Sequence, residues 1–107
     1  MGEEQSGQQL TLRVGEIFQV ELPGPGGTGY SWYLDNLDSR YLELVSHEIQ
    51  QASPERMVGG PLLYLWRFKA KKEGQTQIKM AYYRVWEGIG TAPKHFLLNI
   101  TIGPNSR

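Results

Sequence analysis

Apolar and polar residues alternate along most of this chain, which is the pattern of half-buried β-strands. The alternation predicts seven strands, at residues 10–14, 17–22, 30–34, 41–49, 62–69, 75–83 and 94–102. No segment shows a sustained period near 3.6, so we expect no long helix. Strands about ten residues apart, with turn residues between them, favour an all-β sandwich of seven or eight strands.

The predicted strand at 62–69 has the clearest one-sided pattern. In 62–69, Leu62, Tyr64, Trp66 and Phe68 share one face, and polar residues interrupt the other, which predicts a central strand. The turn at residues 71–74 then leads into 75–83, and we predict that these two strands form a hairpin. The segment between 34 and 41 is polar and is expected to form a connection with a helical turn.

The length and composition restrict the classes of protein that this chain can represent. Its 107 residues fit one domain at 10–102, with a flexible segment at 1–9 and a tail at 103–107. Eleven basic residues balance eleven acidic ones, which argues against nucleic-acid binding and against a polybasic membrane contact. There is no cysteine, hence no disulfide and no thiolate site. No signal peptide is visible, so we expect an intracellular protein or a processed periplasmic or secreted form, and a monomer.

Three long irregular segments, at residues 23–29, 50–61 and 84–93, interrupt the strand pattern. The first is rich in Gly and Pro, which suits a loop that presents its backbone. Tyr30 and Trp32 follow it and point to one face, where they would anchor the loop in the core. Alternate connections of a sandwich gather at one end. The three loops would then make one composite edge.

Candidate catalytic groups are sparse. Residues 24–29 match G-x-G-x-x-G, but a strand follows them where a dinucleotide site needs a helix. The two histidines, His47 and His95, fall inside predicted strands, and a triad of Ser31, His95 and Asp35 would lack a nucleophile elbow. We therefore expect no enzymatic activity, no cofactor and no metal site.

Trp86 is open to two interpretations. Large aromatic side chains belong in cores, so Trp86 could cap one end of the sandwich. It also precedes Glu87 and Gly88 in the third loop, where an exposed tryptophan would be a favoured binding residue.

Three short motifs occur in the loops in a fixed order: Gly27-Thr28-Gly29-Tyr30, then Val58-Gly59-Gly60, then Tyr83-Arg84-Val85-Trp86. With this order and spacing, the chain resembles the chagasin family of inhibitors of papain-like cysteine peptidases, over about residues 10–102. The family pattern is N-P-T-T-G-[YF], G-x-G-G and R-P-[WF] on an immunoglobulin-like β-sandwich. This chain departs from it at residues 25–27, at Met57 and at Val85.

The resemblance implies three peptidase-binding loops and a supporting pair of aromatics. They are Gly26, Gly27, Thr28 and Gly29 in the first loop, Val58, Gly59 and Gly60 in the second, Arg84 and Trp86 in the third, and Tyr30 and Trp32 as support. Gly27 and Thr28 would enter the cleft beside the catalytic cysteine, the second loop would follow the non-primed side, and Trp86 would pack on the primed side. Arg84 would brace its own loop.

The implied function is reversible, tight-binding inhibition of papain-like cysteine peptidases of the papain or cathepsin L type, without a cofactor. The alternative is an immunoglobulin-like adhesion or carbohydrate-binding module, in which Trp86 would stack on a sugar or on a partner protein.

Overall fold

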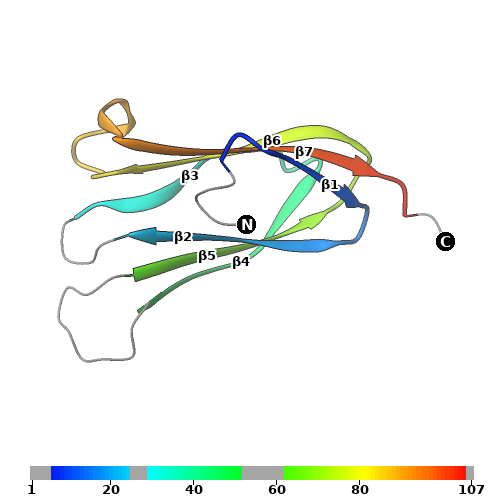
Figure 1. The fold of residues 1–107 in the computed structure, drawn as a ribbon, viewed down its shortest axis with the longest axis horizontal. Coiled ribbons are helices and arrows are strands. Elements are labelled where there is room, and N and C mark those ends of the chain that lie inside the picture. Colours follow the sequence, from blue (N-terminus) through cyan, green and yellow to red (C-terminus); the bar gives the residue numbers. More distant parts are fainter. Residues whose placement is uncertain (1–5, 25–28, 52–61, 106–107) are drawn as a thin grey trace.

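Seven strands form two sheets that pack face to face in the computed structural model, which describes residues 6–24, 29–51 and 62–105 (Figure 1). The strands are β1 (Gln9–Arg13), β2 (Ile17–Gly24), β3 (Ser31–Leu37), β4 (Leu42–Gln51), β5 (Leu62–Ala70), β6 (Gly74–Tyr83) and β7 (Lys94–Gly103). The first sheet has the order β1-β7-β6-β3, and the second has the order β2-β5-β4. The predicted all-β sandwich is therefore confirmed.

The core lies between the sheets and is built from every second residue of the strands. In β5, Tyr64, Trp66 and Phe68 are at most 2% exposed, and β5 pairs on both sides, as the prediction of a central strand required. In β7, the buried residues are Phe96, Leu98, Ile100 and Ile102. Burial of one large apolar side chain contributes about 1.5–3 kcal/mol, so this alternation supplies the main driving force for the fold.

The predicted hairpin of residues 62–69 and 75–83 is wrong. β5 pairs with β2 and β4, whereas β6 pairs with β3 and β7, so the turn between β5 and β6 crosses from one sheet to the other. A strand that buries one face shows the same alternation whether its neighbour in sequence lies beside it or opposite it. The alternation therefore could not distinguish a hairpin from a crossing between sheets.

Two bulges explain where the sequence pattern was weakest. β3 continues to Leu37, beyond the predicted end at 34, because a bulge between Leu34 and Asn36 accommodates the polar residues of this segment. In β4, a second bulge between Leu44 and Ser46 interrupts the alternation. β4 is also an edge strand, and Leu44 remains 40% exposed. An extra residue in one strand shifts all later side chains to the other phase of the pattern.

The turn between β3 and β4 is held by an ion pair. The Asp38 carboxylate accepts hydrogen bonds from Arg40 Nε at 3.0 Å, Arg40 Nη2 at 2.7 Å and the Arg40 backbone N–H at 3.0 Å. The side-chain hydrogen bonds from Arg40, followed by the backbone bond, lower the pKa of Asp38 from 3.8 to about 2. Tyr41 N and Leu42 N both donate to the Asp38 carbonyl oxygen, which completes the turn.

Substitution Arg40→Gln is expected to return the pKa of Asp38 toward its ordinary value of 3.8. Because the pKa is depressed in the folded state, the stabilising effect of this pair is present above the unfolded pKa and is lost as pH falls through about 2. The measurement is an NMR titration of the Asp38 carboxyl carbon. Lys72→Gln is the control, since Lys72 acts on Asp38 only through a minor long-range attraction. An unchanged Asp38 titration in the Arg40→Gln protein would contradict this account.

Candidate functional site

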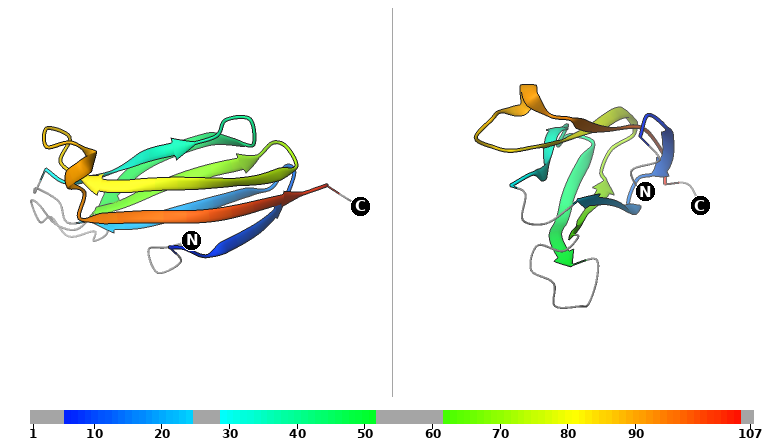
Figure 2. Two further views of the ribbon diagram at one scale, coloured as in Figure 1. Left: turned by 90° about the horizontal axis from the view of Figure 1, so that it is seen from above. Right: turned by 60° about the vertical axis from the view of Figure 1, so that its left-hand side comes forward.

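The stems of the three predicted loops open at the same end of the sandwich (Figure 1). In the second sheet, Leu62 pairs with both Gly24 and Gln51, so the end of β2, the end of β4 and the start of β5 are neighbours. In the first sheet, Ser31 pairs with Tyr83, and Tyr82 pairs with Lys94. In the left panel of Figure 2, these ends of β6 and β7 lie together at the left-hand side.

Two of the predicted loop tips lie outside the described residues. These are the tip of the first loop, with Gly26, Gly27 and Thr28, and the second loop, with Val58, Gly59 and Gly60. The described part of the site therefore consists of the first-loop stem with Gly29, and the whole third loop with Arg84 and Trp86.

The first-loop stem is fastened by Trp32, which is 1% exposed. Its Nε1–H donates a hydrogen bond of 3.0 Å to the carbonyl oxygen of Pro23. Pro23 belongs to β2 and Trp32 to β3, so this bond joins the two sheets directly at the point where the loop leaves and returns. A buried indole N–H needs such a partner, and the carbonyl supplies it. Trp32 therefore lies in the core directly beneath the first-loop stem.

Tyr82 of β6 fills the space between the stems. Its ring packs against Tyr30 at 5.3 Å and against Trp32 at 5.2 Å between centroids, and it is 5% exposed. A Cβ atom at Gly24 would lie 3.1 Å from Tyr82 Cε1 and 3.2 Å from Tyr64 Cε1. Gly24 therefore lets the end of β2 approach these two rings closely.

Arg84 braces the third loop from its first residue. Its guanidinium carbon lies 4.4 Å from the centroid of the Tyr30 ring, and its Nη1 lies 3.5 Å from Glu87 Oε2. The Arg84 carbonyl oxygen accepts the N–H groups of Glu87, at 2.9 Å, and of Gly88, at 3.2 Å. A short 3-10 helix, η2 (Ile89–Thr91), follows, so the loop is compact and internally hydrogen-bonded.

Trp86 is on the surface of this loop, with 69% of the residue exposed. Val85 at 60% and Ile89 at 41% are exposed on the same loop. One edge of the indole contacts the first loop, because a Cβ atom at Gly29 would lie 2.5 Å from Trp86 Cη2. The alternative that Trp86 caps the core is therefore wrong. Apolar side chains held in water at a loop are a typical feature of binding surfaces.

The described residues show no group of three or more histidine, aspartate or glutamate side chains that could hold a metal ion. His47 lies exposed on the edge strand β4, where its ring stacks on Trp66 at 4.9 Å, and His95 lies exposed on β7. Within the same part of the chain, no helix is long and apolar enough to cross a membrane.

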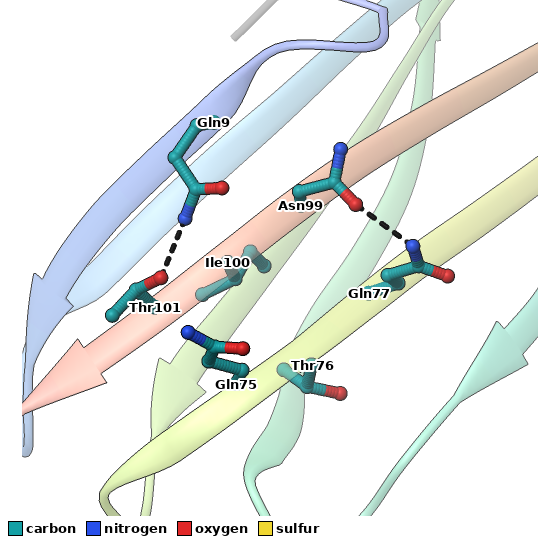
Figure 3. Close-up of a pocket in the computed structure, with 7 residues that line it drawn as sticks. All are labelled: Gln9, Gln75, Thr76, Gln77, Asn99, Ile100 and Thr101. Atoms are coloured by element: carbon teal, nitrogen blue, oxygen red, sulfur yellow. Dashed lines mark hydrogen bonds between the residues drawn. The ribbon is translucent and has the colours of Figure 1, made fainter.

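A shallow depression of about 260 Å³ lies on the outer face of the first sheet, over β1, β6 and β7 (Figure 3). Amide and hydroxyl side chains dominate its lining, and several already bond to one another: Gln9 Nε2 donates to Thr101 Oγ1 at 2.6 Å, and Gln77 Nε2 donates to Asn99 Oδ1 at 2.8 Å. In the β6–β7 register these residues lie toward Gly74, away from the loop end. The depression is thus separate from the loop site.

Sequence reasoning did not identify Tyr82 and Gly24 as site residues. Tyr82 lies on the core face of β6, and its pairing with Trp32 of β3 places it under the loops. Gly24 falls inside the predicted first loop at 23–29, whereas in the structure it is the last residue of β2.

Comparisons with known proteins point to one family. Residues 11–100 match the model of the family described as Chagasin family peptidase inhibitor I42. Chagasin of Trypanosoma cruzi is 26% identical to this chain over 86 residues, which is 78% of each protein. The resemblance predicted from the three loop motifs is thus confirmed.

Solved structures show the same fold. The cysteine protease inhibitor EhICP2 of Entamoeba histolytica aligns with a TM-score of 0.86 at 24% identity, covering 96% of this chain and 93% of that one. PbICP-C, solved in complex with falcipain-2, aligns with a TM-score of 0.71 at 22% identity, covering 89% and 86%. Leishmania mexicana ICP aligns with a TM-score of 0.61 at 25% identity, covering 89% and 88%.

Substitution Trp32→Phe is expected to loosen the first-loop stem, since it removes the donor to Pro23 and leaves the part-buried Pro23 carbonyl without this bond. We expect a loss of about 1–3 kcal/mol in the free energy of unfolding, measured by urea denaturation. Amide hydrogen exchange should also accelerate locally at the ends of β2 and β3. Exchange that accelerates equally at the opposite end, near Ile17, would show that the effect is global.

Proposed function

Because the chain belongs to the chagasin family of peptidase inhibitors, we propose that it reversibly inhibits papain-like cysteine peptidases by presenting its three loops to the active-site cleft. The observation that carries the proposal is the convergence of the three loop stems at one end of the sandwich, with Trp86 exposed beside Gly29. The relative PbICP-C was solved in complex with falcipain-2.

The first loop is proposed to enter the cleft. Gly26, Gly27, Thr28 and Gly29 carry small side chains or none, so their backbone can come close to the catalytic cysteine of the peptidase. The hydrogen bond between Trp32 and Pro23 fixes the two ends of this loop, which lowers the conformational entropy that binding costs. A pre-organised stem is what a tight-binding inhibitor needs.

The second and third loops are proposed to flank the first. Val58, Gly59 and Gly60 would lie along the non-primed side and offer backbone hydrogen bonds. On the primed side, Trp86 would bury its exposed indole against an apolar or aromatic surface, and Val85 extends the apolar area. Arg84 supports the loop through Tyr30 and Glu87 and is not proposed as a peptidase contact.

Inhibition on this scheme is non-covalent and needs no cofactor. The chain contains no cysteine and so cannot form a disulfide with the catalytic thiol. A standard protein–protein interface buries about 1,600 Å² in total, and interfaces of this size reach nanomolar affinity when the binding loops are pre-organised. One copy of the chain supplies all three loops, so a monomer suffices.

The proposal is tested by titrating papain and a cathepsin L-type peptidase with the purified protein and following hydrolysis of a fluorogenic substrate. Stoichiometric loss of activity that recovers on dilution supports it. Full peptidase activity at micromolar protein would overturn it and would favour the adhesion or carbohydrate-binding alternative, to be followed by a glycan-binding assay with the wild-type and Trp86→Ala proteins.

Substitution Thr28→Arg should abolish inhibition, because a long charged side chain at the tip of the first loop would block entry into the cleft. The melting temperature should stay nearly unchanged, since the proposed role places this side chain in the cleft and not in the core, and substitutions outside the core usually change stability by at most about 0.5 kcal/mol. The matched control is Thr11→Arg, the same replacement at an exposed position of β1, which should inhibit like the wild type. Inhibition by the Thr28→Arg protein at wild-type strength would contradict insertion of this loop.

Substitution Trp86→Ala should weaken binding by about 30-fold, corresponding to about 2 kcal/mol for a hot-spot residue. The change should appear mainly as faster dissociation, measurable by surface plasmon resonance on an inactivated peptidase. Ile17→Ala is the control, because Ile17 is also exposed, at 56%, but lies at the other end of β2. Equal effects of the two substitutions would remove Trp86 from the interface.

A further inference from the structure

Gly29 and Trp86 come from different loops and are in direct contact. A Cβ atom built on Gly29 would lie 2.5 Å from Trp86 Cη2, 3.1 Å from Cζ2 and 3.5 Å from Cζ3. These atoms form one edge of the six-membered ring of the indole. The backbone of the first loop therefore supports the ring that the third loop exposes to solvent.

Two independent constraints favour glycine at position 29. Its φ angle is 84°, a left-handed conformation that residues with a Cβ atom adopt only with strain. The second constraint is the indole itself, which occupies the space of a side chain. Gly15 separates these constraints, because it has φ 97° but open space within 4 Å of its Cβ position.

A second contact joins the same two loops one residue further along. The guanidinium of Arg84 lies over the ring of Tyr30 at 4.4 Å, and Tyr30 in turn stacks on Tyr82 at 5.3 Å. Two adjacent residues of the first loop thus meet two residues of the third loop. The contact of Gly29 with Trp86 is therefore continuous with the contact of Tyr30 with Arg84.

We propose that Gly29 is a positioning residue for Trp86, and that their contact makes the first and third loops one binding surface rather than two independent ones. The inference rests on the proposed function for its consequence in inhibition. An indole that is 69% exposed would otherwise sample several rotamers. Fixing a mobile side chain on binding costs conformational entropy, and a ring already supported by Gly29 avoids part of that cost.

The contact is tested first in the free protein by NMR. In the wild type, the ring current of Trp86 should displace the α-proton resonances of Gly29, and Trp86→Ala should return them to ordinary values. Gly29→Ala should shift the indole resonances of Trp86, whereas the control Gly15→Ala, with a similar backbone strain and no indole nearby, should leave them in place. Unchanged Gly29 resonances in the Trp86→Ala protein would overturn the inference.

The consequence for binding is tested by a double-mutant cycle on the inhibition constant for papain. Gly29→Ala should weaken inhibition about tenfold more in the protein that keeps Trp86 than in the Trp86→Ala protein, because only the former has an indole to displace. Gly15→Ala should inhibit like the wild type. Additive effects of Gly29→Ala and Trp86→Ala would mean that Gly29 acts through its own loop alone and would overturn the inference.

A rescue variant addresses backbone strain. Combining Gly29→Ala with Trp86→Phe places a smaller ring at the third loop, which leaves room for the methyl group, and should recover part of the inhibition lost by Gly29→Ala alone. Strain in the first loop would not be relieved by this change. If the wild-type protein itself fails to inhibit any peptidase, the proposed function fails, and the NMR shifts of Gly29 and Trp86 still decide whether the two loops are joined.

Discussion

The packing of Tyr82 between the loop stems is the interaction on which this end of the molecule depends. Its ring lies against Tyr30, the residue before β3, and against Trp32 of β3, and Gly24 of β2 approaches it closely. Trp32 also links β3 to β2 here, through its hydrogen bond to the Pro23 carbonyl oxygen. One aromatic side chain from the third-loop stem thereby sets the position of both ends of the first loop. Aromatic pairs of this kind add about 0.5–1.5 kcal/mol each beyond their burial.

At this end of the molecule, the buried residues and the exposed residues have separate roles. The buried aromatics hold the stems, while the residues proposed to meet a peptidase, such as Trp86 and Val85, remain exposed and contribute little to the core. Arg84 lies between the two groups, with its guanidinium on Tyr30 and its Nη1 toward Glu87. Loop tips on such a base can vary in sequence without destabilising the sandwich, which suits a protein whose function is recognition.

The sequence alone predicted the seven strands and the central position of 62–69, because burial on one side leaves a period of two. It could not predict which sheet each strand joins, so the expected hairpin of β5 and β6 was wrong. The bulges in β3 and β4 could not be predicted either. An inserted residue shifts which positions of the strand face the core, but it leaves the amino-acid composition of the strand typical of a β-strand. The loop motifs indicated the site, but the contact of Gly29 with Trp86 depends on how the two sheets pack.

The pairing of β1 with β7 has a consequence for how the chain folds as it is made. β1 is the first strand and an edge strand, and its partner β7 is the last, joined to it in parallel from Gln9 opposite Asn99 to Arg13 opposite Gly103. Pairings between distant segments are slow to form because a long intervening chain must first be ordered. During synthesis, β1 therefore has no sheet partner until β7 has left the ribosome. The polar side chains of Gln9, Thr11 and Arg13 would help to prevent the unpaired β1 from pairing with strands of other chains.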